Sequence, residues 1–149
     1  MKKITLALLF AFVCRIGFAQ LIESKKIIDS LKHDLAISKD DSSRAMTLMR
    51  LFVGYRSLNI DSGQFYGREG LNLSRKIKFP KGEAWALHYL SMTQESLGNY
   101  PKALEINLIA LKIAEANDLI DLKGRLLRGI GGDYIWSKDY SKALDWAYL

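Results

Sequence analysis

Cysteine, proline and histidine are scarce in this 149-residue chain, which has one Cys, two Pro and two His. A single cysteine excludes a small fold held by disulfides, and so few prolines exclude a collagen-like or proline-rich disordered chain. His33 and His88 stand far apart and form no metal-binding spacing such as HExxH. No nucleophile motif or phosphate-binding loop occurs either. We therefore expect a globular protein without a metal, a cofactor or catalytic residues.

The N-terminal segment 1–19 has the character of a removable export signal. Two lysines precede an apolar run at 4–14, and the small residue Ala19 suits a signal peptidase. The run is too short for a transmembrane helix, which needs about 20 residues. We predict cleavage before Gln20 and an exported, periplasmic protein. Lipidation of Cys14, as in a bacterial lipoprotein, and retention of the segment as an N-terminal helix are the alternatives.

The formal net charge of +6 lies partly in this signal. Removing Lys2, Lys3 and Arg15 from the 22 basic residues leaves 19 against 16 acidic ones, a net charge of +3. So small a charge argues against a nucleic-acid partner. No apolar run of membrane-spanning length follows position 20, so we expect no membrane span in the mature chain.

An internal repeat is the strongest pattern in the chain. The segment GNYPKAL at 98–104 reappears 40 positions later as KDYSKAL at 138–144, and a fainter copy surrounds Gly63. In each copy, apolar residues follow helical spacing on both sides of a turn, and no alternating strand pattern competes with it. The repeat predicts helical hairpins at about 44–81 and 82–121, with a third, truncated one at 122–149.

The predicted hairpins begin their second helices at recognisable caps. Asn99 and Asp139 have N-capping side chains, and Asp61 or Ser62 is expected to take that place in the first copy. A further helix with its loop is predicted at 20–43, before the repeats. Its apolar stripe is Ile22, Ile27, Ile28, Leu31 and Leu35, and the loop at 40–43 is expected to cap the next helix.

Small and large residues recur at matching positions of the second and third hairpins. The matching positions are Leu87, Leu90, Tyr100 and Ala103 in the second hairpin and Leu127, Ile130, Gly131, Tyr134, Tyr140 and Ala143 in the third. We expect Gly131 to mark a close contact between helices. Gly129 and Gly132, in the same helix, should weaken it locally.

This pattern resembles the tetratricopeptide repeat (TPR) family, in its variants with long helices. The resemblance covers about residues 44–149 and implies an all-α fold: an α-solenoid of antiparallel helical hairpins, with about two and a half repeats behind an N-terminal capping helix. The sequence departs from the family pattern at Gln94, where an aromatic is usual, and at Asn107 and Ala147, where Phe is usual. No proline closes the repeats.

The resemblance also implies a ligand surface, because the first helix of each hairpin lines a concave groove in this family. A groove with an apolar wall and with Arg125 and Arg128 one helical turn apart suits a peptide with an acidic end. The alternative is that these side chains form core and solvated surface. Carried over by register, the groove residues are Met46, Met49, Val53, Trp85, His88, Met92, Arg125 and Arg128.

The function implied is that of an exported, non-catalytic module that binds a protein or peptide. Sequences with this resemblance often form the sensory front of membrane-bound bacterial histidine kinases or regulators. The alternative is a free-standing periplasmic or lipid-anchored adaptor. The edge at 136–149 is apolar and has no polar capping helix, which predicts either a longer protein or a homodimer through that edge.

Overall fold

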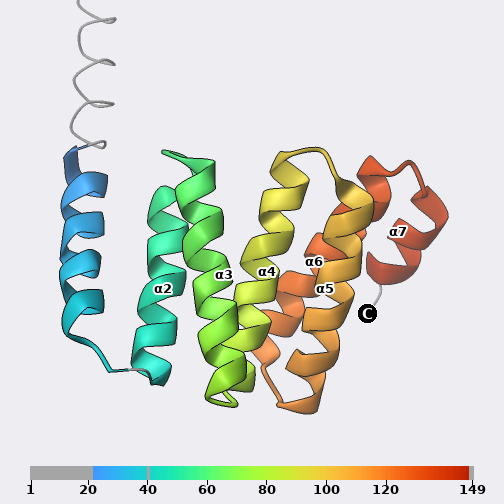
Figure 1. The fold of residues 1–149 in the computed structure, drawn as a ribbon. Helices are drawn as coiled ribbons and strands as arrows, with labels where there is room; N and C mark the ends of the chain where they lie inside the picture. The colour runs from blue at the N-terminus through green and yellow to red at the C-terminus, as the bar shows by residue number, and fades with distance from the viewer. Residues whose placement is uncertain (1–21, 40, 148–149) are drawn as a thin grey trace, which may run out of the picture.

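The computed structural model describes residues 22–39 and 41–147. All regular structure in these two ranges is helical, which confirms the all-α class. The predictions for the signal at 1–19 and for Cys14 lie outside the described residues. A helix at 22–37 is followed by α2 (Ser42–Tyr55), α3 (Ile60–Lys76), α4 (Pro80–Ser96), α5 (Tyr100–Ala116), α6 (Ile120–Trp136) and α7 (Tyr140–Ala147) (Figure 1).

From α3 onward, the helices follow a strict spacing. They begin at positions 60, 80, 100, 120 and 140, and three residues separate each helix from the next. The helices α3, α4, α5 and α6 each have 17 residues. The 40-residue period of the sequence is therefore a pair of helices of equal length.

The four turns from α3 to α7 share one backbone conformation. Each has one residue in the left-handed region, and the N–H after it donates to a carbonyl five residues back, as Asn99 does to Gln94 at 2.8 Å. This is the Schellman ending of a helix, which favours glycine because a Cβ is strained there. Non-glycine residues hold three of the four positions, which are Lys78, Gly98, Asp118 and Lys138.

The N-caps agree with the sequence at two helices and differ at a third. The caps predicted at Asn99 and Asp139 are confirmed, since each side chain accepts the backbone N–H three residues on, at 3.4 and 3.3 Å. The prediction of Asp61 or Ser62 for α3 is wrong. Asn59 is the cap, and its side chain accepts the Ser62 N–H at 2.8 Å. Asp61 lies inside the first turn, where its negative charge favours the helix dipole.

The helices form a row in which each packs against the next (Figure 1). The helices α2, α4 and α6 also contact one another along the row, α2 with α4 and α4 with α6. Together they therefore present one side of the molecule. The largest core cluster fills the space between α4, α5 and α6, with Ala84, Leu87, Ala110, Leu111, Ala114, Leu122, Leu126 and Ile130. None of the described helices is both long and apolar enough to cross a membrane.

The apolar stripe of the N-terminal helix is narrower than its sequence predicts. Ile28 and Leu31 are buried against α2, but Ile22 and Ile27 are 43% and 49% exposed. The helix is the first of the described row, so it has a neighbour on one side alone. The loop cap is as expected: the Asp41 side chain accepts the Arg44 N–H at 3.0 Å.

The close contact predicted at Gly131 is wrong. A Cβ at Gly131 would meet no atom within 4 Å, whereas one at Gly129 would lie 3.1 Å from Nδ2 of Asn107. Tyr140 is 65% exposed, because no described helix follows α7 to cover it. The remaining motif positions are buried or half-buried: Leu87, Leu90, Tyr100, Ala103, Leu127, Ile130, Tyr134 and Ala143.

The apolar edge expected near the C-terminal side is exposed in the structure. Trp136, Tyr140 and Leu144 are all more than half exposed on α6 and α7. A second copy of the chain covering this edge stays a prediction.

Candidate ligand pocket between α2, α4 and α6

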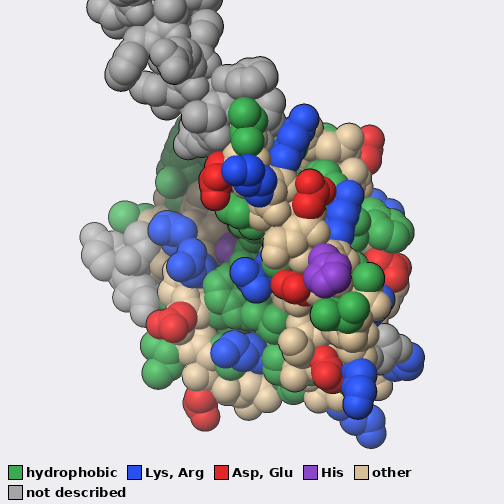
Figure 2. All heavy atoms as spheres, turned by 90° about the vertical axis from the view of Figure 1, so that its left-hand side faces the viewer, with side chains coloured by type: hydrophobic (Ala, Val, Ile, Leu, Met, Phe, Trp, Pro, Cys, Tyr) green, Lys and Arg blue, Asp and Glu red, His purple; other side chains and the backbone are tan. Residues whose placement is uncertain are grey.

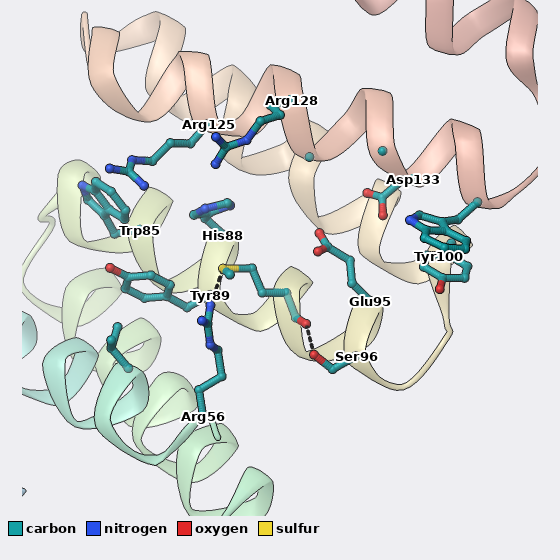
Figure 3. A pocket seen from close by; sticks show the side chains of 15 residues that line it. Arg56, Trp85, His88, Tyr89, Glu95, Ser96, Tyr100, Arg125, Arg128 and Asp133 are labelled. Carbon is teal, nitrogen blue, oxygen red and sulfur yellow. Dashed lines mark hydrogen bonds between the residues drawn. The ribbon is translucent and has the colours of Figure 1, made fainter. Parts of the chain in front are cut away.

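A pocket of about 670 Å³ opens on the side formed by α2, α4 and α6 (Figure 3). Its volume lies within the range of sites that enclose drug-sized ligands. Figure 2, which looks along the row from the N-terminal helix, shows a hollow beside that helix with apolar and basic side chains around it. The pocket is lined by Val53, Arg56, Trp85, His88, Tyr89, Met92, Glu95, Ser96, Tyr100, Arg125, Arg128, Gly129, Gly132, Asp133 and Trp136.

Most of the predicted groove residues line this pocket, and two do not. Met49 is 1% exposed and belongs to the core between α2, α3 and α4, and Met46 packs against the same core. Both lie one or two turns before Val53 on α2, on a stretch that α3 and the N-terminal helix cover. The predicted residues that do line the pocket are Val53, Trp85, His88, Met92, Arg125 and Arg128.

Three arginines line the pocket, Arg125 and Arg128 on α6 and Arg56 after α2. Arg125 lies with its guanidinium carbon 5.6 Å from the centre of the Trp85 ring, a cation–π contact. Arg56 donates to the sulfur of Met92 at 3.7 Å. Within the described ranges, no carboxylate lies within ion-pair distance of Arg56, Arg125 or Arg128. Arg56 is not among the predicted groove residues, because it follows the last residue of α2 and falls in a turn.

A buried polar cluster lies at another part of the pocket, centred on Asn107 of α5. Asn107 Oδ1 lies 2.5 Å from the Ser91 hydroxyl, and its Nδ2 donates to Asp133 Oδ2 at 3.0 Å. The same Nδ2 is 3.5 Å from Oε1 of Glu95. Gly129 makes room for this amide, since a Cβ there would lie 3.1 Å from it. The amide is fully buried, and it links α4, α5 and α6.

Two buried polar atoms of the pocket have no hydrogen-bond partner among the described residues. They are Nδ1 of His88 and Oδ1 of Asp133, whose residues are 7% and 1% exposed. A buried polar atom left unpaired costs about 1–3 kcal/mol. Both residues line the same pocket, so a polar group of a bound molecule is able to supply the missing partners.

The pocket shifts the proton affinity of its ionisable groups in opposite directions. Burial raises the pKa of Asp133 from 3.8 to about 6, and the nearby Glu95 adds to the shift while the Asn107 hydrogen bond opposes it. Burial likewise raises the pKa of Glu95. The pKa of His88 is lowered, chiefly by burial and also by the arginines around it. At pH 7 the pocket therefore holds a neutral imidazole and a largely ionised Asp133.

Aromatic rings form the remaining walls. Trp85 and Tyr89 lie with ring centres 5.4 Å apart near Arg125, and Tyr100 stacks on Trp136 at 5.8 Å near the polar cluster. Trp136 is 68% exposed although it is a large aromatic. Such faces suit the apolar side chains or methylene groups of a ligand.

No protein-family model matches the chain, and no curated protein matches it in sequence. In the described part of the chain, no three His, Cys, Asp or Glu residues gather in a way that would hold a metal ion.

Proposed function

We propose that this chain is an exported, non-catalytic helical-repeat module that binds a peptide segment of a partner protein in the pocket between α2, α4 and α6. The observation that carries the proposal is the set of three arginines without carboxylate partners, among the described residues, in an aromatic-walled pocket. Guanidinium groups without a carboxylate partner, beside apolar walls, suit a peptide that ends in, or carries, a carboxylate.

The arrangement of the helices supports a TPR-like solenoid as the scaffold. Paired helices of equal length recur with the period of the sequence repeat, and each packs on its neighbours along the chain. The pocket lies on the first helices of successive hairpins, which is the surface that the resemblance to the TPR family implies for peptide binding.

We also propose that the module is the sensory part of a larger signalling protein. Reading the coding sequence beyond Leu149 tests that role, because a membrane span followed by a kinase or DNA-binding domain is expected there.

Selection of peptides from a random 12-residue library on the mature protein tests the binding proposal. We expect the selected peptides to be rich in carboxylates. Arg128→Ala should weaken their binding about tenfold or more, because a charge-assisted bond is lost. Trp85→Ala should weaken it by removing apolar contact and the ring under Arg125.

The matched control is Arg50→Ala, which removes an exposed arginine of α2 that does not line the pocket. It should leave the affinity unchanged. Equal affinity of the Arg128 and Trp85 variants with the wild type, while their circular dichroism stays helical, would contradict the proposal.

A further inference from the structure

The end of the pocket away from Arg125 and Arg128 carries two carboxylates, those of Glu95 and Asp133 (Figure 3). Asp133 and Glu95 both accept from Nδ2 of Asn107, whose two N–H groups are thereby used. The second oxygen of Asp133, Oδ1, has no partner within the described residues although Asp133 is 1% exposed. This end therefore has more hydrogen-bond acceptors than donors.

The space beside Asp133 is open to a ligand. Gly132 lines the pocket, and a Cβ built there would meet no atom within 4 Å. Gly129, one turn earlier on the same helix, also lines the pocket and presents no side chain. The Asn107 amide lies over Gly129, so a small group that enters over Gly132 approaches the two carboxylates.

We propose that Asp133 and Glu95 form a subsite for a primary ammonium group, and that the ligand is a short zwitterionic peptide. Its amino terminus lies at the two carboxylates, and its carboxylate lies at Arg125 and Arg128. The inference rests on the proposed peptide-binding function and deepens it by fixing the direction and the end groups of the ligand. The ammonium group donates to Oδ1 of Asp133 and to Glu95.

An ammonium group fits this subsite better than a metal ion does. Calcium takes six to eight oxygen ligands and magnesium requires a near-octahedral set, whereas two carboxylates are available here. An ammonium group donates three hydrogen bonds, which suits a site with more acceptors than donors. Its positive charge also stabilises an ionised, buried carboxylate that has no cationic partner. The neighbouring His88 is neutral by its lowered pKa and does not compete as a cation.

The separation of the two ends sets the length of the peptide. Arg125 and Arg128 lie eight and five residues before Asp133 on α6, which corresponds to a helix rise of about 12 Å and about 7.5 Å. An extended peptide spans about 3.4 Å per residue. The two ends are therefore matched by about two to four extended residues, which a pocket of about 670 Å³ can hold.

Equilibrium dialysis of the mature protein against a randomised tetrapeptide pool, read by mass spectrometry, tests this inference. Four forms of the pool are compared: free at both ends, N-acetylated, C-amidated and blocked at both ends. We expect the free form to be retained. Acetylation and amidation should each reduce retention about tenfold or more, because each removes a charge-assisted contact.

Asp133→Asn provides the decisive variant, because it removes the charge and nearly preserves the shape. In this variant the free pool and the N-acetylated pool should be retained equally. The free pool should still be retained better than the C-amidated pool. Glu95→Gln should reduce the same preference, and it keeps the test available if Asp133→Asn fails to fold. The matched control is Gly131→Ala, a change in the same helix at a position outside the pocket, which should bind as the wild type does.

The outcomes separate this inference from the function on which it rests. If the N-acetylated pool is retained as well as the free pool, the ammonium subsite is wrong, and carboxylate recognition by the arginines stands. If no tetrapeptide form is retained but longer peptides are selected from the 12-residue library, the short zwitterionic ligand is wrong and the proposed function stands. If a mixture of free amino acids is retained in place of the tetrapeptides, the length is wrong. If neither tetrapeptides nor longer peptides bind, both proposals fail.

Discussion

Gly67 and Asn107 occupy the same position of the sequence repeat and make opposite kinds of contact. At Gly67 of α3, a Cβ would lie 3.1 Å from both Phe52 and Leu90, so these apolar side chains occupy the space where a side chain would be. At Asn107 of α5, the amide fills that space and bonds to Ser91 and Asp133. One helix interface is therefore apolar, and the equivalent one is polar.

The difference shows how a repeated scaffold acquires a site. In the apolar interface, Phe52 is 1% exposed and stacks on Tyr89 with ring centres 5.0 Å apart. In the polar interface, the repeat equivalent of Phe52 is Met92, which is half-buried and lines the pocket. Close packing in the first hairpin supports the helices, and the polar, less filled second interface offers hydrogen-bonding groups to a ligand.

The largest effect should come from the apolar interface. Phe52→Ala removes a fully buried ring and leaves a cavity, so we expect the free energy of unfolding to fall by about 3–5 kcal/mol. Met92→Ala, at the equivalent position, should cost less than half as much because its side chain already lies beside a cavity. Urea denaturation of both variants checks this. Equal losses would show that the two interfaces contribute alike.

The polar interface should also make the free energy of unfolding depend on pH, which the apolar interface should not. Because the folded pKa of Asp133 is raised to about 6, its ionisation opposes folding, and stability is lost as the pH rises from about 4 through 6. His88 acts in the opposite sense, because its lowered pKa removes stability as the pH falls below 6.5. Comparing wild type with Asp133→Asn cancels the His88 contribution.

We therefore expect the stability of Asp133→Asn relative to wild type to rise by roughly 2 kcal/mol between pH 4 and pH 7.5, from the size of the pKa shift. Thermal or urea unfolding across this pH range measures the difference. A difference that does not change with pH would mean that Asp133 is not held in a desolvated site.

The smallest change in stability should come from replacing a glycine in open space, Gly131, or in a closely packed interface, Gly67, by alanine. Gly131→Ala adds a methyl group to open space within α6 and should raise the free energy of unfolding by about 1 kcal/mol through helix propensity. Gly67→Ala has the same propensity gain, but its methyl group would lie 3.1 Å from Phe52 and Leu90, so it should gain less. The order of the two melting temperatures is the measurement, and a larger gain at Gly67 would contradict the close packing seen there.

The repeat and the caps could be predicted from sequence because their signals are local. Asn99 and Asp139 lie at matching turns and act within three residues, so the repeating pattern reveals them. The error at Asn59 arose because Asp61 and Ser62 are equally good capping residues by type. The choice among neighbouring polar residues depends on where the preceding helix ends.

The polar half of the pocket could not be predicted, because its members come from three helices. Asn107 and Asp133 are 26 positions apart, and in the sequence Asn107 was a departure from an expected aromatic residue. The error at Met49 has a related cause, since one turn of α2 is covered by its neighbours and the next one borders the pocket.

The helices, their period and the turns between them follow from local features of the sequence, because helix propensity, caps and apolar spacing act over a few residues. Which polar groups are buried together depends on how the helices pack. Burial depends on the side chains that three packed helices bring to one place, and it sets both the raised pKa of Asp133 and the unpaired atoms of the pocket.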